Sequence, residues 1–207
     1  MSEPVYDERY ARPGLYWGSK PTQLARGVVR IARSLPSRPR TLVDLGSGEG
    51  RDSIYFAQRG MRVLGVDISS VGVQKAERRA SKLGVKVRFQ VGDMRTFRLA
   101  RPVDVVFSSG ALNNLPRRIR AVRFEHFKAQ TAAGGINAVN ADVLKPYIPV
   151  YSMNPCATPF RSGELLGYYW DWEILDSGSG EFISHAGGVP HRKAMDMVIA
   201  RKPRTVR

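Results

Sequence analysis

Cysteine and long apolar runs are the first things this sequence lacks. Cys156 is the single cysteine among 207 residues, so no disulfide can form within the chain, which is typical of proteins in a reducing compartment. No apolar run approaches the roughly 20 residues that a membrane-spanning helix needs. The first residues, MSEPVYDERYARPG, contain acids and no apolar segment, unlike a signal peptide. We therefore expect a cytoplasmic protein that does not associate with a membrane.

Acidic residues are also scarce relative to basic ones. The chain has 33 Lys and Arg against 18 Asp and Glu, a formal net charge of +15 and a pI of about 10.5. Such an excess is typical of proteins that bind polyanions such as RNA. However, the basic residues are scattered, and the densest runs, RRIRAVR and RKPRTVR, lack the interleaved aromatic residues of a single-strand binder. Nucleic acid is therefore the less favoured partner, and the sequence leaves the oligomeric state open.

Short β-branched segments alternate with helical patterns over the middle of the chain. The predicted helices cover 21–35, a segment that Ser69 caps and Gly84 ends, and a segment that starts at Pro116. This alternation predicts an α/β fold with a doubly wound, mostly parallel sheet. Two further segments predict an antiparallel C-terminal strand pair, which completes a seven-stranded sheet. The seven predicted strands are 41–45, 61–66, 85–90, 103–108, 136–140, 172–177 and 194–200.

The chain after residue 140 has a different character. Residues 145–160, KPYIPVYSMNPCATPF, are rich in proline and aromatic residues and have no period, so we expect a long loop that forms a lid or a substrate wall. A short helix is expected at SGELLGYY. Residues 178–193, GSGEFISHAGGVPHRK, are expected to connect the last two strands.

A glycine-rich turn follows the first predicted strand, in LVDLGSGEGRDS (42–53). Glycines occupy positions 46, 48 and 50, with Asp44 just upstream. Dinucleotide binders need G-x-G-x-x-G, but the position that requires the third glycine is Arg51, so a dehydrogenase is the least favoured interpretation. An acid at the end of the strand would repel a pyrophosphate and attract a ligand that carries a positive charge. A strand, glycine turn and helix together form a site for a ligand at the helix N-terminus.

This acid and glycine pattern resembles the first motif of the class I S-adenosylmethionine-dependent methyltransferases, which have a Rossmann-like fold. The resemblance implies that Asp44 lies near the methionine amino group of S-adenosylmethionine. It also implies that the turn lets the backbone approach the methionine part of this cofactor closely, through Gly46, Ser47, Gly48 and Gly50.

Further cofactor contacts are implied after the next strands. Asp67 lies 21 residues after Gly46 and would accept the ribose hydroxyls, with Ile68 beside the adenine. The resemblance places Asp93 and Met94 at the adenine amino group and ring, and Ser108 near the methionine. Tyr16 and Trp17, in GLYWGSKP, would cover the cofactor, where an aromatic face next to a sulfonium gains cation–π energy.

The range of possible methyl acceptors is narrowed by motifs that the chain lacks. SSGALNNLP follows the fourth strand in place of the acid or Asn, two prolines and an aromatic of base N-methylating enzymes. Cys156 lies in the late loop, where it does not suit the nucleophile of a cytosine C5 enzyme, and one cysteine is too few for an arsenite methyltransferase. Asn113 and Asn114 are candidate substrate-binding residues.

The C-terminal third resembles the tellurite-resistance methyltransferases, which have relatives among the thiopurine-type enzymes. The resemblance rests on FRSGELLGYYWDWEILDSGSGEF and on MDMVIARKP. That family has a His-Arg pair and a further arginine facing the substrate in its last hairpin. Here the nearest candidates are displaced by a few positions, and we take His185, His191 and Arg192 as the catalytic candidates.

Together these features predict an S-adenosylmethionine-dependent methyltransferase that acts on a small molecule, such as a thiol or a chalcogen oxyanion, without a metal. An RNA methyltransferase and a non-catalytic nucleotide-binding module are the alternatives. We expect one domain over residues 1–207. Its three parts would be an N-terminal cap and helix (1–40), a cofactor-binding core (41–140), and a substrate loop and C-terminal hairpin (141–203).

Overall fold

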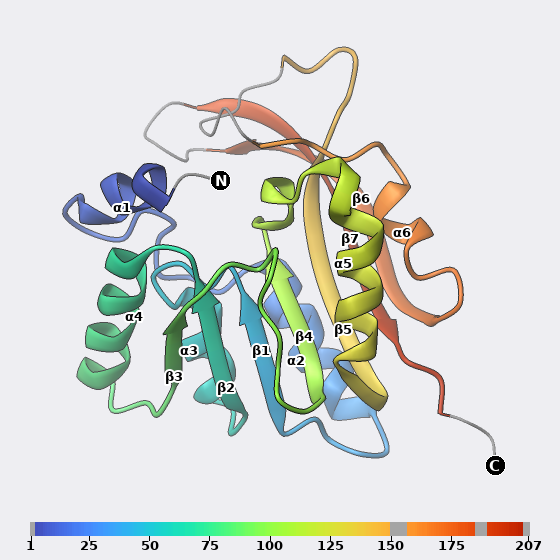
Figure 1. Ribbon diagram of the computed structural model, residues 1–207, viewed down its shortest axis with the longest axis horizontal. Coiled ribbons are helices and arrows are strands. Elements are labelled where there is room, and N and C mark those ends of the chain that lie inside the picture. Colours follow the sequence, from blue (N-terminus) through green and yellow to red (C-terminus); the bar gives the residue numbers. More distant parts are fainter. Residues whose placement is uncertain (1–2, 150–156, 185–189, 205–207) are drawn as a thin grey trace.

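The seven strands form one mixed sheet in the computed structural model, which describes residues 3–149, 157–184 and 190–204 (Figure 1). The strand order is β3-β2-β1-β4-β5-β7-β6. Strands β1 to β5 are parallel, and β7 runs antiparallel to both of its neighbours. The predicted fold class is therefore confirmed. The bounds are β1 Thr41–Leu45, β2 Arg62–Asp67, β3 Arg88–Val91, β4 Val103–Ser109, β5 Thr131–Val143, β6 Glu173–Ser184 and β7 His191–Arg201.

Helices cover both faces of the sheet because alternate strand residues are apolar on each side. One face packs against α2 (Gln23–Ser34), α3 (Arg51–Ala57) and α4 (Ser70–Lys82), and the other packs against α5 (Arg117–Ala129) and α6 (Glu164–Gly167). Figure 1 shows α5 in front of the sheet and α2 behind it. A 3₁₀ turn, η1 (Leu112–Asn114), links β4 to α5.

The predicted helix boundaries rest on caps that the structure contains. The Ser69 hydroxyl accepts a hydrogen bond from the Gly72 backbone N–H at 2.9 Å, and Gly84 follows the end of α4 with a φ of 65°. The Thr22 hydroxyl caps α2 by accepting from the Ala25 N–H at 3.1 Å. The Ser69 cap fixes where the chain leaves β2 and begins α4, and the Thr22 cap fixes where the N-terminal segment turns into α2.

Three parts of the prediction need correction. Helix α1 (Glu3–Ala11), which packs on α4, was not among the predicted helices. Strand β5 starts five residues earlier than expected. Strand β6 continues to Ser184, so Gly180 and Glu181 belong to a strand and not to a connection. Glycine and serine disfavour strands, but pairing with the full length of β7 overrides that local preference.

Residues 150–156 of the predicted loop, Cys156 among them, lie outside the described residues. In the described parts of the chain, no helix is both long and apolar enough to cross a membrane.

Candidate functional site

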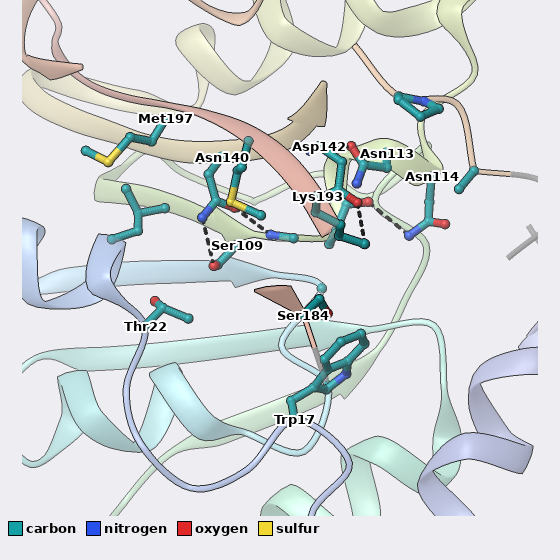
Figure 2. A pocket seen from close by; sticks show the side chains of 18 of the residues that line it. Trp17, Thr22, Ser109, Asn113, Asn114, Asn140, Asp142, Ser184, Lys193 and Met197 are labelled. Atoms are coloured by element: carbon teal, nitrogen blue, oxygen red, sulfur yellow. Dashed lines mark hydrogen bonds and ion pairs between the residues drawn. The ribbon is translucent and has the colours of Figure 1, made fainter. Parts of the chain in front are cut away.

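A large pocket opens at the carboxyl ends of the parallel strands (Figure 2). Its volume is about 960 Å³, and its lining comes from the N-terminal segment, the glycine turn, the β4–η1 link and strands β5 to β7. In doubly wound sheets, ligands bind where the strand order reverses, which is here between β1 and β4. Pocket volumes for drug-sized ligands span roughly 300–1,000 Å³, so this pocket has room for a nucleoside cofactor and a second molecule.

The glycine turn forms the floor of the pocket, where its backbone is accessible because glycine has no side chain. Gly46 has a φ of 81°, and a Cβ there would lie 2.2 Å from the Ala111 Cβ. Gly48 has a φ of 52°, and its Cβ would meet the Tyr10 hydroxyl at 2.8 Å. Both positions therefore require glycine for conformation and for space. Gly50 is different, because its missing side chain makes room for Ala76 and Phe89 outside the pocket.

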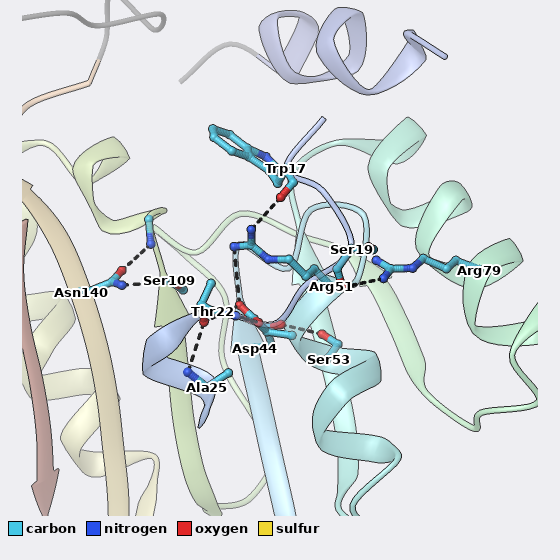
Figure 3. A network of polar contacts seen from close by, with 12 residues as sticks. Trp17, Ser19, Thr22, Ala25, Asp44, Arg51, Ser53, Arg79, Ser109 and Asn140 are labelled. Atoms are coloured by element: carbon cyan, nitrogen blue, oxygen red, sulfur yellow. Dashed lines mark hydrogen bonds and ion pairs between the residues drawn. The ribbon is translucent and has the colours of Figure 1, made fainter. Parts of the chain in front are cut away.

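Asp44 lies at the pocket floor, where β1 ends, and is 2% exposed. Its carboxylate accepts a hydrogen bond from the Ser53 hydroxyl at 2.6 Å, as Figure 3 shows. Burial, with a smaller contribution from the Asp52 carboxylate, raises the pKa of Asp44 to about 7. A cationic group placed beside Asp44 would favour the ionised form, so this position suits an ammonium group.

Asp67 ends β2 at the next position along the pocket. Its carboxylate accepts hydrogen bonds from the backbone N–H groups of Gly48, at 2.8 Å, and Ser69, at 2.9 Å. Burial raises the pKa of Asp67 to about 6, and these N–H groups partly oppose that shift. Ile68 and Met94 line the pocket beside it. This combination of an acid, a glycine turn without side chains and apolar neighbours fits a nucleoside. A carboxylate at this position can accept hydrogen bonds from the two ribose hydroxyl groups.

Besides Gly50, two residues expected at the cofactor do not line the pocket. Asp93 turns back on its own loop, where its carboxylate accepts from the Arg95 backbone N–H at 2.9 Å and pairs with the Arg95 guanidinium. Ser108 is fully buried, and its hydroxyl donates to the Leu45 carbonyl at 2.8 Å. Strand side chains alternate between faces, so Ser109 is the serine that reaches the pocket.

Aromatic side chains of the N-terminal segment form the pocket wall opposite the last strands. Tyr16 and Trp17 line the pocket, as expected, and their rings meet edge to face at 4.8 Å. The Trp17 indole N–H donates to the Tyr10 hydroxyl at 3.1 Å. Tyr6 and Tyr10, which the sequence analysis missed, belong to α1 and also line the pocket. Their spacing of four residues was the signal for this helix face.

Cations of α3 and α4 hold this N-terminal wall in place. The Lys75 ammonium donates to the carbonyls of Tyr10 and Gly14, each at 2.7 Å, and pairs with Glu49 at 2.7 Å. The Arg51 guanidinium donates to the Trp17 carbonyl at 2.8 Å, a contact visible in Figure 3. Arg51 stands where a dinucleotide-binding motif would need its third glycine. Here it holds the aromatic wall against the glycine turn.

Asn113 and Asn114 both line the pocket. Asn113 Oδ1 accepts from the Asp142 backbone N–H at 3.0 Å. The Asn114 amide donates to the Tyr6 hydroxyl at 2.9 Å, which joins η1 to α1. Each asparagine therefore has a structural partner and a place in the lining.

Of the three catalytic candidates in the C-terminal hairpin, His185, His191 and Arg192, the structure places only Arg192 in the pocket lining among the described residues. Arg192 reaches the pocket rim, where its side chain is 55% exposed and pairs with Glu181. His191 begins β7 without lining the pocket, and His185 lies outside the described residues. Sequence reasoning missed Asp142 and Lys193, whose carboxylate and ammonium lie 2.6 Å apart in the pocket lining. In NAVNADV, the polar residues 140 and 142 alternate with apolar ones, which was the available signal.

The glycine turn, the two buried acids and the sheet define a class of protein. Residues 42–135 match the family model described as a methyltransferase domain, and the mixed sheet is that of class I methyltransferases. The chain therefore contains a class I S-adenosylmethionine-dependent methyltransferase domain. Among similar solved structures is that of TehB from Haemophilus influenzae, with a TM-score of 0.74 and 23% identity over 86% of this chain and 62% of that chain.

Two of the three curated relatives described here are named methyltransferases, and the third is named a hemagglutinin. The chain is 25% identical to "Probable S-adenosyl-L-methionine-dependent methyltransferase TehB" of H. influenzae over 67% of this chain and 48% of that protein. It is 32% identical to trans-aconitate 2-methyltransferase of Deinococcus radiodurans over 65% of this chain and 50% of that protein. It is also 25% identical to hemagglutinin 1 of Eikenella corrodens, over 80% and 55%. The chain spans about half the length of these relatives.

Proposed function

We propose that this protein transfers a methyl group from S-adenosylmethionine to a small-molecule acceptor. The observation that carries the proposal is the pair of buried acids, Asp44 and Asp67, on either side of a bare glycine turn in one pocket. Asp44 is placed for the cofactor's ammonium group and Asp67 for its ribose hydroxyls. The methyltransferase domain match supports methyl transfer, and the name of the trans-aconitate relative supports a small acceptor.

The chain's own residues would act by binding and positioning. S-adenosylmethionine supplies, when bound, a sulfonium methyl group that the acceptor's lone pair displaces, so that the bonding electrons remain on sulfur as S-adenosylhomocysteine. Trp17 and Tyr16 would exclude water and face the cation, an interaction worth roughly 0.5–2 kcal/mol. Asn113 and Asn114 would contact the acceptor from η1. Holding donor and acceptor in line is worth roughly 7–11 kcal/mol of the barrier.

Two of the cations on the acceptor side are paired with acids. Arg192 pairs with Glu181, and Lys193 pairs with Asp142. A chalcogen oxyanion would have to compete with a carboxylate for either of these two cations. Lys145, a third cation on this side of the lining, donates to the Ser162 hydroxyl at 3.0 Å and forms no ion pair among the described residues, so it could still meet an anionic group of the acceptor. These pairs therefore support an organic acceptor, a thiol among the candidates, over selenite or tellurite.

Isothermal titration calorimetry tests the cofactor assignment. We expect S-adenosylhomocysteine to bind at one site per chain and NAD⁺ to give no binding heat at the same concentrations. Binding of NAD⁺ in preference to S-adenosylhomocysteine would contradict the proposal. Cofactor binding without turnover of any acceptor would favour the non-catalytic nucleotide-binding module.

The raised pKa values predict a pH dependence of cofactor affinity. Below its pKa of about 7, Asp44 must give up a proton before it can hold an ammonium group, and Asp67, with a pKa of about 6, adds to this requirement below pH 6. We expect S-adenosylhomocysteine to bind about tenfold more tightly at pH 8 than at pH 6, with the affinity levelling off above pH 8.

Calorimetry from pH 5.5 to 8.5 measures this effect, and Asp44→Asn is the control that should flatten the upper part of the curve. Without ligand the same shifts act in the opposite direction. Both carboxyls bind protons more tightly in the folded protein than an aspartate does at its ordinary pKa of 3.8, so their contribution to stability falls as pH rises from about 4 to 7. Affinity that does not change with pH would show that neither acid has to ionise for binding.

A further inference from the structure

The last three strands present an ordered surface to the pocket. Strand pairing aligns residues across β5, β7 and β6, and every member of the two rows lines the pocket. Each row runs from a polar residue on β5, through a methionine on β7, to a glycine on the edge strand β6. The rows are Asn140, Met197 and Gly178, and then Asp142, Met195 and Gly180.

Neither glycine of this surface is explained by the fold. Gly178 and Gly180 are absent from the glycines with positive φ, so their backbone would accept any residue. A Cβ at Gly180 would meet nothing within 4 Å, and one at Gly178 would meet only the Met197 Cγ, at 3.8 Å. By contrast, Gly46 is required by both its φ and its contacts. Glycine weakens a strand and often marks a bulge, a bend, or a place where a ligand or another backbone approaches closely, and both glycines here pair in regular register with β7.

The methionines give the same surface an apolar, adaptable middle. Met195 and Met197 are half-buried and line the pocket, whereas Val198, between Met197 and Ile199, is buried and lies outside the lining. Methionine is flexible, and its sulfur makes favourable contacts with aromatic rings. Figure 2 shows Met197 and Asn140 on one side of the pocket and Trp17 across from them. The space is therefore bounded by an aromatic ring on one side and by thioethers on the other.

We propose that the methyl acceptor is a flat apolar molecule, an aromatic or conjugated ring system with one polar reacting group. Its ring system lies against Met195 and Met197, its edge occupies the space left by Gly178 and Gly180, and its reacting atom is directed toward Asn140 and Asp142. This inference rests on the proposed function and specifies its substrate class. The two glycines determine the size of acceptor that fits.

Methionine methyl NMR tests this placement without knowledge of the natural acceptor. The protein carries ¹³C-methyl methionine, and Met94, Met195 and Met197 are assigned by substitution with leucine. S-adenosylhomocysteine should shift the Met94 signal, which reports on the cofactor side of the pocket. With that ligand saturating, 2-naphthol should then move the Met195 and Met197 signals by ring-current shifts, and 1-octanol at the same concentration should leave them in place.

Gly180→Val should weaken 2-naphthol binding by about tenfold or more, because a side chain then fills the ring's place, while S-adenosylhomocysteine affinity stays unchanged. Gly167→Val is the matched control, since a Cβ at Gly167 also meets nothing within 4 Å and this residue lies outside the pocket lining. Gly180→Ala should give an intermediate loss. Unmoved Met195 and Met197 signals, or equal shifts with 1-octanol, would overturn the inference while the Met94 shift still stands. Absence of the Met94 shift would count against the proposed function itself.

Discussion

Asp67→Ala is expected to weaken S-adenosylhomocysteine binding by about 10²–10⁴-fold. The proposed role of Asp67 is to accept a hydrogen bond from each of the two ribose hydroxyl groups. Hydrogen bonds to a charged group contribute roughly 1.5–3 kcal/mol each. Two such bonds correspond to about 3–6 kcal/mol, and each 1.4 kcal/mol is a factor of ten in affinity. The substitution also removes the acceptor for the Gly48 and Ser69 N–H groups, which loosens the turn that carries the cofactor. Calorimetry measures the loss.

Asp93→Ala is the matched control, because the family pattern and the structure predict different effects for this substitution. The resemblance places Asp93 at the adenine, whereas the structure pairs it with Arg95 outside the pocket lining. We therefore expect Asp93→Ala to change affinity less than about threefold, which is less than about half of one charged hydrogen bond. Unchanged affinity in Asp67→Ala would refute the assignment of the ribose site. A large loss in Asp93→Ala would show that this acid turns toward the adenine when the cofactor binds.

Gly46→Ala is expected to lower the free energy of unfolding by about 2–6 kcal/mol. A non-glycine residue in the left-handed region costs roughly 1–3 kcal/mol. The new methyl group would also start 2.2 Å from the Ala111 Cβ, and such overpacking adds roughly 1–3 kcal/mol. Urea unfolding followed by circular dichroism measures this change. S-adenosylhomocysteine should raise the unfolding midpoint of the wild-type protein and not that of the variant.

Gly60→Ala separates the two causes. Gly60 has a φ of 84°, close to the 81° of Gly46, but a Cβ there would meet nothing within 4 Å. This control should lose only the conformational part, about 1–3 kcal/mol, and should keep its response to S-adenosylhomocysteine. Equal losses in the two variants would mean that the turn can move away from Ala111, which would contradict a rigid pocket floor.

Much of the cofactor side could be predicted because its signals are local. Asp44 and Asp67 each end a β-branched strand, and the glycines between the first strand and helix have a recognisable spacing. A parallel sheet brings successive strand ends to one edge, so these positions meet in space without any further information. Tyr16 and Trp17 were expected at the cofactor from the family resemblance and from the affinity of an aromatic face for a sulfonium, and both line the pocket.

The errors arise where non-local contacts decide the outcome. Ser108 and Ser109 differ by one position, and strand register determines which of them faces the pocket. The error at Asp93 has a local cause instead, because its carboxylate is satisfied by Arg95 within its own turn, a contact that the strand pattern does not specify.

The acceptor side was harder to predict because its features depend on strand pairing over long distances. Helix α1 contains mostly polar residues and is held through its contacts with α4. The extension of β6 depends on pairing with β7, which its glycine-rich sequence disfavours. Asp142 and Lys193 lie 51 residues apart in sequence, so their ion pair follows only from the sheet.

The most direct test of the central claim is a partition of transferred label. The protein is incubated with methyl-labelled S-adenosylmethionine and cell lysate, and the products are separated into solvent-extractable and acid-precipitable fractions. We predict label in extractable small molecules, with selenite and tellurite giving none in parallel reactions. Label in acid-precipitable material that ribonuclease releases would contradict the account and would make the +15 charge the better guide to the substrate.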